Sequence, residues 1–308
     1  MTLVVGIARR DSIWMLADRR ISYCGTRPPK DDACKLMFLD ATDGVAILGY
    51  AGLGSTALGT EPAEWMSAVL RGRKLPLEQS LSVLARAMQE YLPIHVAALP
   101  GAGRSVHQTV AVAFVAGKPR VYSIDLVVSA DRKKFRFRHK RYVIDRPPAP
   151  QRSPWLIVTG SGQDQLENEE RIRPLLQIVR ATDRGLVNPR IMADQLAKLN
   201  HVVQQHLASV GPRCIVAWRF RRGSLHTAGG GQAHYTRSKR DLDSPALPAI
   251  AHGMDMRALL GAMLPHVVPN LMATLARKPV SEQSKREEER AVQAAVAMLP
   301  DGPDEQMH

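Results

Sequence analysis

The chain has 308 residues, of which 45% are hydrophobic, so it is long enough to bury a full core in one large domain with an appendage. It contains no run of eighteen apolar residues, and its first residues lack the basic and apolar regions of a signal peptide, so we expect a cytoplasmic protein that does not enter a membrane. Cys24, Cys34 and Cys214 have neither CxxC spacing nor a neighbouring histidine cluster, which argues against a disulfide framework and against a metal site.

The formal charge of +13 would suit a polyanionic partner if the basic residues were clustered. The densest basic run extends from Arg132 to Arg141, where Phe135 and Phe137 alternate with Arg136 and Arg138. This period of two indicates a strand with one aromatic and one basic face, and a charged edge strand is the favoured interpretation. Nucleic acid is the less favoured alternative, because no helix-turn-helix, zinc-finger or RNP motif accompanies the run.

The first third of the chain predicts four strands and then two helices. The strands are short β-rich runs separated by polar turns, and the helices have apolar residues at helical spacing. The strands are expected at Leu3 to Ala8, Ser12 to Ala17, Lys35 to Leu39 and Val45 to Leu48, and the helices at Ser55 to Leu70 and Pro76 to Leu92. A loop is expected at Gly101 to Gly103.

Strands and a second pair of helices are predicted next. Asn188 is a plausible cap for the second of these helices, with Pro189 at its first position. The strands are expected at Thr109 to Val115, Arg120 to Val127, Lys134 to Ile144 and, after a proline-rich connector at Arg146 to Pro154, at Trp155 to Thr159. The helices are expected at Gln163 to Arg180 and Asn188 to Ala208. Two closing strands are expected at Arg213 to Arg221 and Leu225 to Ala228. Paired helices between groups of strands predict an α+β fold with two packed sheets and helices on both sides.

Gly229 to Gly231 predicts a flexible boundary, after which the composition changes. We therefore expect a domain over residues 2–228 and a C-terminal extension over 229–308. The apolar part of the extension, about 254–277, is expected to be a docking segment in which Pro265 and Pro269 interrupt any helix. The charged part, about 279–308, is expected to be a mobile tail.

Thr2 directly follows the initiator methionine, and removal of Met1 would give Thr2 a free α-amino group. One residue could then supply both a nucleophile and a base, because an N-terminal amine of modest pKa lies within reach of its own hydroxyl. Many proteins begin with Met-Thr, so Thr2 alone is weak evidence for a nucleophile. The residues that follow it must support the assignment.

The opening of the chain resembles that of proteasome β subunits and the HslV peptidase. The resemblance is carried by Leu3 to Ala8, by Asp11, by Trp14 to Arg20 and by Ser22, with Lys35 at the start of the next strand. It implies that Thr2 is the nucleophile, that Asp18 followed by the basic Arg20 returns beside it, and that Lys35 is the family lysine. Physically, a lysine ammonium beside Thr2 would lower the pKa of nearby proton-carrying groups, and Asp18 would hold it and balance its charge. Taken singly, Asp18 with Arg20 could be a surface ion pair, and Lys35 a solvated strand end.

Two glycine-containing turns extend the resemblance. Ala46 to Gly54 is similar to the turn whose amide serves the family as an oxyanion donor, with Gly52 the first choice and Gly49 the second. A tight turn from strand to helix would also require glycine there. Gly160-Ser161-Gly162 is similar to the family's Gly-Ser-Gly, which implies a hydrogen bond from Ser161 near the threonine amine, whereas a cap-like turn is the alternative.

One departure from the family pattern concerns the segment before Gly211. The family supplies an aspartate there, but residues 206–211 contain none, so Ser209 is expected to take part of its place in the network. The missing carboxylate puts the tuning of the threonine amine in question. It therefore favours the alternative of a catalytically silent protein.

The resemblance covers residues 2–228 and implies a four-layer αββα sandwich of two antiparallel sheets, as in N-terminal-nucleophile (Ntn) hydrolases. It implies a threonine-type amide hydrolase without cofactor or metal, which assembles into rings or arcs and cleaves peptides or unfolded chains. A separate ATPase would drive unfolding, since the chain has no GxxxxGK[ST] motif. Two other interpretations stay open: a silent proteasome-like scaffold or polyanion binder, and a small-substrate Ntn amidohydrolase.

Overall fold

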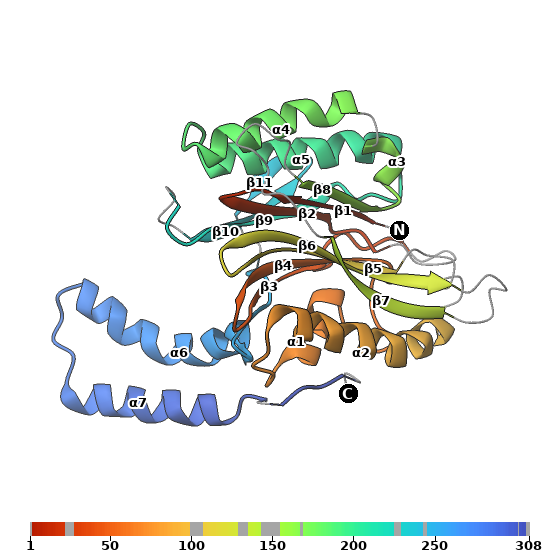
Figure 1. Ribbon diagram of the computed structural model, residues 1–308. Helices are drawn as coiled ribbons and strands as arrows, with labels where there is room; N and C mark the ends of the chain where they lie inside the picture. The colour runs from red at the N-terminus through yellow and green to blue at the C-terminus, as the bar shows by residue number, and fades with distance from the viewer. Residues whose placement is uncertain are drawn as a thin grey trace.

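Two β-sheets lie face to face in this protein, and helices cover the outer side of each (Figure 1). The computed structural model describes residues 2–21, 28–98, 107–128, 135–142, 155–166, 169–224, 229–242, 245–300 and 302–305. The predicted α+β class is confirmed. The loop at Gly101 to Gly103, the connector at Arg146 to Pro154 and the strand at Leu225 to Ala228 lie outside the described residues.

The first sheet has the strand order β11-β10-β9-β2-β1-β8, and all of its neighbouring strands are antiparallel. Its strands are β1 (Leu3–Ala8), β2 (Ser12–Asp18), β8 (Trp155–Gly160), β9 (Arg213–Phe220), β10 (Gly230–Thr236) and β11 (Lys239–Asp241). Every residue of β1 and β2 is buried, because these strands are covered on both faces. Near-continuous apolar sequence in a short strand is the expected result of such burial.

The second sheet has the order β13-β12-β3-β4-β5-β6-β7. Its strands are β3 (Leu36–Asp40), β4 (Gly44–Ala51), β5 (Gln108–Val115), β6 (Lys118–Val128), β7 (Phe135–Tyr142), β12 (Ala249–Ala251) and β13 (Met254–Asp255). β12 runs parallel to β3, so this sheet is mixed, and the prediction of two purely antiparallel sheets is corrected at that pair. Residues 135–141 of the basic run lie in β7, which is an edge strand of this sheet, as the sequence predicted.

Three apolar clusters hold these layers together. The central cluster lies between the sheets and includes Met15, Leu36 and Val112. The helices α1 (Pro62–Leu70) and α2 (Leu77–Ala98) pack on the second sheet, and α4 (Glu169–Asp183) and α5 (Pro189–His206) pack on the first. The short helix α3 (Gln163–Leu166) connects β8 to α4. Asn188 caps α5 as predicted, since its side chain accepts from the N–H of Arg190 at 2.9 Å.

The first helix begins later than its sequence pattern predicted. It starts at Pro62 rather than Ser55, because residues 56–60 form a turn in which the N–H of Gly59 donates to the Thr56 carbonyl at 3.0 Å. Glu61 takes the extended conformation of an N-cap, and a proline at the first helical position needs no partner for its missing N–H. The turn before it contains exposed residues, including Leu58.

Part of the chain after residue 228 belongs to the two sheets. Strands β10 and β11 continue the first sheet, and β12 and β13 continue the second, so both sheets extend beyond the boundary suggested by the glycine run. The segment from Met256 to Leu275 is one helix, α6, and Pro265 and Pro269 lie within it rather than interrupting it. Each proline removes a single backbone donor, and the turns on either side keep the helix continuous. The charged segment forms the helix α7 (Glu282–Ala297) rather than a structureless tail.

Candidate functional site

Strand ends from both sheets bring Thr2, Asp18 and Lys35 together. Thr2 precedes β1, Asp18 ends β2, and Lys35 precedes β3. The antiparallel register of β1 and β2 pairs Val4 with Ala17, which sets the start of one strand beside the end of the other. All three side chains are buried, with 2%, 0% and 3% of their surface exposed. The three residues that the resemblance placed at one point therefore do meet there.

The hydroxyl of Thr2 lies between the two charged groups. It donates to Asp18 Oδ1 and accepts from Lys35 Nζ. The Lys35 ammonium also donates to Asp18 Oδ1 at 3.1 Å and to the Arg20 carbonyl at 2.6 Å, so each of its three donors has an acceptor. Burial lowers the pKa of Lys35, and the neighbouring Asp18 carboxylate opposes that shift. A buried ammonium with a full set of acceptors is held in one orientation toward the threonine hydroxyl.

Asp18 is fixed by the backbone around it. Its Oδ1 accepts from the N–H of Leu3 at 2.8 Å, and its Oδ2 accepts from the N–H groups of Arg20 at 3.0 Å and Gly211 at 3.2 Å. Hydrogen bonds from backbone amides to a carboxylate are charge-assisted and stronger than those between neutral groups. Asp18 thus connects β1, β2 and the turn before β9, and it can hold Lys35 without moving.

The side chain of Arg20 has a different role from the one suggested by the sequence. Its guanidinium binds Asp31 at 2.7 and 2.9 Å and donates to the Ala208 carbonyl at 2.6 Å, whereas only its backbone N–H contacts Asp18. The hydrogen bonds to Asp31 raise the pKa of Arg20. The ion partner of Asp18 is Lys35, so the alternative of a surface pair between Asp18 and Arg20 is wrong. Arg20 supports the site by joining the loop at Asp31 to the segment at Ala208.

Ser161 and Ser209 lie on the other side of Thr2. The Ser161 hydroxyl is 3.5 Å from the Thr2 carbonyl oxygen and 3.0 Å from the Ser209 hydroxyl. Gly160, with a φ of +91°, packs so closely that an added Cβ would lie 1.9 Å from that same carbonyl oxygen. The Gly-Ser-Gly segment therefore contacts the backbone of Thr2, and its serine connects Thr2 to Ser209 in the segment before Gly211.

The two candidate oxyanion glycines differ in their surroundings. Gly49 lies inside β4, where an added Cβ would meet Met15, Val4 and Leu36 within about 3 Å, so it is packed between the sheets. Gly52 directly follows the last residue of β4 and is partly exposed. Its φ of +149° is a backbone conformation that favours glycine. Of the two, only Gly52 has an amide outside the strands. Its role as oxyanion donor stays a prediction.

A pair of residues that the sequence did not reveal supports the Gly52 turn. The Tyr50 hydroxyl accepts from the N–H of Leu53 at 3.2 Å and lies 3.0 Å from His107 Nδ1. Burial raises the pKa of Tyr50, which keeps the phenol neutral and able to donate to the imidazole. An added Cβ on Gly52 would lie 2.6 Å from that hydroxyl and 2.7 Å from the imidazole. No motif connects Tyr50 to His107, because β5 brings them together only in the folded chain.

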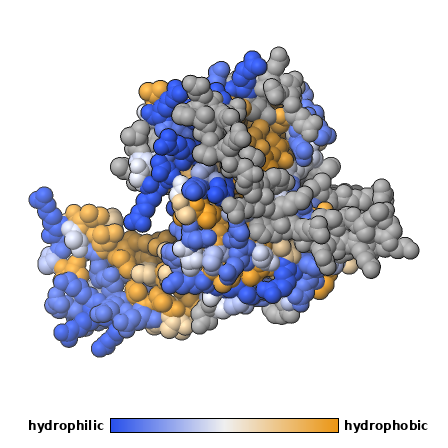
Figure 2. All heavy atoms as spheres, viewed as in Figure 1, coloured by the Kyte–Doolittle hydropathy of each residue, from blue (hydrophilic) through white to orange (hydrophobic). Residues whose placement is uncertain are grey.

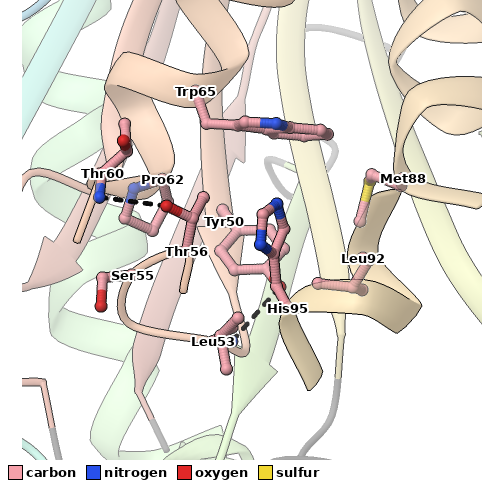
Figure 3. A pocket seen from close by; sticks show the side chains of 10 residues that line it. All are labelled: Tyr50, Leu53, Ser55, Thr56, Thr60, Pro62, Trp65, Met88, Leu92 and His95. Atoms are coloured by element: carbon pink, nitrogen blue, oxygen red, sulfur yellow. Dashed lines mark hydrogen bonds between the residues drawn. The ribbon is translucent and has the colours of Figure 1, made fainter. Parts of the chain in front are cut away.

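A small cavity lies behind this turn (Figure 3). Its walls are mainly apolar, and Trp65, Met88 and His95 face it from α1 and α2. Burial lowers the pKa of His95, whose Nδ1 accepts from the N–H of Ala57 at 3.3 Å. The volume of about 30 Å³ would hold one or two waters, so the cavity as it stands is no substrate pocket.

Comparison with solved structures gives distant matches. One is Anbu (ancestral beta-subunit) from Yersinia bercovieri, with 14% identity, a TM-score of 0.48, and coverage of 91% of this chain and 99% of that one. The Anbu (Gly-1) mutant from Hyphomicrobium sp. strain MC1 gives 14% identity and a TM-score of 0.47, over 78% and 89%. The helical assembly of the Anbu complex from Pseudomonas aeruginosa gives 14% and 0.43, over 91% and 98%. No protein-family model and no curated protein matches the chain.

Proposed function

We propose that the chain is a threonine-type amide hydrolase of the Ntn class, built as an αββα sandwich, which acts on peptides or unfolded chains. One observation carries the proposal: the buried Lys35 ammonium donates to the Thr2 hydroxyl and to Asp18 at once. Keeping an ionised lysine and aspartate away from water is costly unless each is fully hydrogen-bonded. Placing a threonine hydroxyl between two buried charges therefore costs free energy, and a purely structural role gives no reason for that cost.

Each residue takes one part in the proposed reaction. Removal of Met1 gives Thr2 a free amine, which accepts the hydroxyl proton as Oγ attacks the substrate carbonyl. The Lys35 ammonium stabilises the alkoxide that develops at Oγ, and Asp18 keeps that ammonium in place. The amide of Gly52 stabilises the oxyanion. The protonated Thr2 amine then gives its proton to the departing amine of the substrate, so the C–N bond breaks and the acyl group stays on Oγ as an ester. Water attacks this ester while the Thr2 amine takes one of the water protons, and the amine returns that proton to Oγ as the carboxylic acid leaves.

The experiment begins with the mass of the purified protein. We expect the intact mass to lack Met1, and we expect hydrolysis of short fluorogenic peptides by the wild type but not by a Thr2→Ala variant. Full retention of Met1 would remove the proposed base. Equal hydrolysis by the two proteins would show that the activity comes from another residue or from a contaminant.

A catalytically silent proteasome-like protein is the second candidate, and one observation favours it. The Ser161 hydroxyl contacts Ser209, where the resemblance implies a carboxylate that would tune the threonine amine. A Ser209→Asp variant separates the two candidates. If the wild type has no peptidase activity and the variant gains it, the chain is a silent member whose remaining machinery is intact.

A further inference from the structure

The helices α6 and α7 form a hairpin that projects from the two sheets (Figure 1). No residue of either helix is buried. This is unusual for α6 because only Arg257 among its twenty residues is charged. A soluble helix normally has one apolar stripe and a polar face, and a helix that is apolar all round is buried in a larger core or in a bilayer.

The exposed surface of α6 is large and apolar. The side chains that form it are 40–70% exposed: Leu260, Leu264, Val268, Leu271, Met272 and Leu275. Figure 2 shows hydrophobic atoms along α6 and hydrophilic atoms over α7. Isolated exposed leucines are common on proteins, but a continuous row of this length marks an interaction surface.

The hairpin is fastened at both ends and cannot bury this surface by folding back locally. At its start, the N-cap residue Asp255 belongs to β13, which pairs with β12 in the second sheet, and its side chain accepts from the N–H of Ala258 at 3.0 Å. Beyond α7, the segment 302–305 is bound to α1: the Trp65 indole donates to the Glu305 carbonyl at 3.1 Å, and the N–H of Asp304 donates to the Ala68 carbonyl at 2.9 Å. The apolar side of α6 is therefore presented in a fixed position.

Asn270 fixes α7 along one side of α6. Its side-chain oxygen accepts from the Ser284 hydroxyl at 2.9 Å, and its amide group contacts Glu288. α7 therefore lies against the side of α6 that carries Asn270, and the apolar side chains named above stay exposed. The remaining apolar surface of α6 needs a partner that is itself apolar.

We propose that this surface binds the α6 helix of a second copy of the chain across a two-fold axis. Two identical helices can pair because α6 has one charge in twenty residues and no like-charge repulsion along its length. Half of the cylindrical surface of a helix about 30 Å long and about 10 Å in diameter amounts to roughly 500 Å². Two copies would bury about 1,000 Å², which is the lower limit for a specific interface between proteins.

A bilayer is the competing partner, since α6 is long and apolar enough to cross a membrane by length and composition. Asn270 and the charged α7 fastened to it argue against insertion. A membrane-spanning α6 would have to release α7 and carry an unpaired amide into the hydrocarbon. A second α6 can be accommodated with both contacts kept, so we favour the second copy.

The test is the mass of the full chain in solution, measured by light scattering and sedimentation over a range of concentrations. Leu264 and Val268 are four residues apart on one side of α6, and a two-fold contact contains each of them twice. We expect a Leu264→Lys/Val268→Lys double variant to weaken self-association at least ~100-fold, because two buried apolar side chains are lost from each copy. Leu186→Lys is the matched control, because Leu186 is 73% exposed on the opposite helical layer and should change nothing. Circular dichroism checks that all three proteins are folded.

Two results would overturn the proposal. Association of the double variant with the affinity of the wild type would show that α6 is not the contact. A monomeric wild type that floats with phosphatidylcholine–phosphatidylserine vesicles, while the double variant does not, would assign the surface to lipid. Neither result bears on the chemistry of Thr2, which is measured separately by peptide hydrolysis.

Discussion

The Lys35 ammonium lies 3.1 Å from the Asp18 carboxylate, and both side chains are almost completely buried. Asp18 ends a strand of one sheet and Lys35 directly precedes a strand of the other, so this ion pair forms only when the sheets are stacked. The assembled fold thereby creates the electrostatic environment of Thr2. Substitutions at these positions should therefore have distinguishable effects on the rate of peptide hydrolysis and on the free energy of unfolding.

Replacement of Thr2 by alanine should abolish peptide hydrolysis and leave the protein folded. The change removes one hydroxyl, while the direct contact between Lys35 and Asp18 remains. Thr2→Ser is the matched control, because it keeps a nucleophilic hydroxyl and should retain measurable turnover. Initial rates with a fluorogenic peptide, together with the melting temperatures of the three proteins, decide the outcome.

Lys35→Ala and Asp18→Asn should each lower kcat/KM by at least ~100-fold, the lower end of what a positioned proton-handling group contributes. Lys35→Ala removes the direct contact with Thr2, the proposed nucleophile, and Asp18→Asn removes the charge that balances the ammonium. Single-turnover rates on pure, folded protein are the measurement. Rates equal to those of the wild type in both variants would rule out these roles.

Loss of Asp18 should destabilise the protein more than loss of Lys35. Asp18→Ala leaves three backbone N–H groups without their acceptor and the buried Lys35 ammonium without its counter-charge, at a cost of ~3–5 kcal/mol. Lys35→Met leaves Asp18 with all three backbone donors, so its cost should be at least ~1 kcal/mol smaller. Urea denaturation of both variants tests the order, and the reverse order would contradict the assignment of Asp18 as the fixed point.

The protonation of Lys35 should make the free energy of unfolding increase with pH. Because burial lowers the folded-state pKa of Lys35, the unfolded chain binds its proton more tightly between that pKa and the ordinary value of 10.5. The penalty for burying the ammonium is therefore full at low pH and is relieved as the pH rises through this window. We expect the unfolding free energy of the wild type, relative to Lys35→Met, to increase with pH. A difference that decreases would contradict a lowered pKa.

Gly160→Ala should disrupt the start of β1. The added methyl group would lie 1.9 Å from the Thr2 carbonyl oxygen, at a φ of +91°. Gly59→Ala is the matched control, because Gly59 has a φ of +90° but no heavy atom within 4 Å of the added carbon. Gly160→Ala should cost at least ~2 kcal/mol more in unfolding free energy than Gly59→Ala. Equal costs would show that the close packing against Thr2 relaxes freely.

The sequence predicted most of the strands and the meeting of Thr2, Asp18 and Lys35, because buried strands have local patterns and the opening residues carry a recognisable motif. It did not predict the position of the Arg20 side chain, because Asp31 binds the guanidinium only in the folded chain. The contact between Tyr50 and His107 across β4 and β5 was missed for the same reason.

Two glycines of the run at 229–231, which was predicted to be flexible, lie in a strand of the first sheet. Gly231 lies in β10, where an added Cβ would be 2.6 Å from the Trp218 ring, and Gly230 approaches the Trp218 carbonyl equally closely. These glycines allow two strands to pack tightly beside a large aromatic residue. Composition alone cannot distinguish this use of glycine from a flexible linker.

The parallel pairing of β12 with β3 has a consequence for how the chain is made. Residues 38–40 pair with residues 249–251, so the outer edge of β3 stays open until nearly the whole chain has left the ribosome. At ~5–20 residues per second, the delay for roughly 200 residues is about 10–40 s. During that time the nascent chain presents an unpaired apolar strand edge, which is a site for aggregation or for a chaperone. Arrest of synthesis before residue 249 should therefore yield chains that aggregate, and release after residue 255 should yield chains that stay soluble.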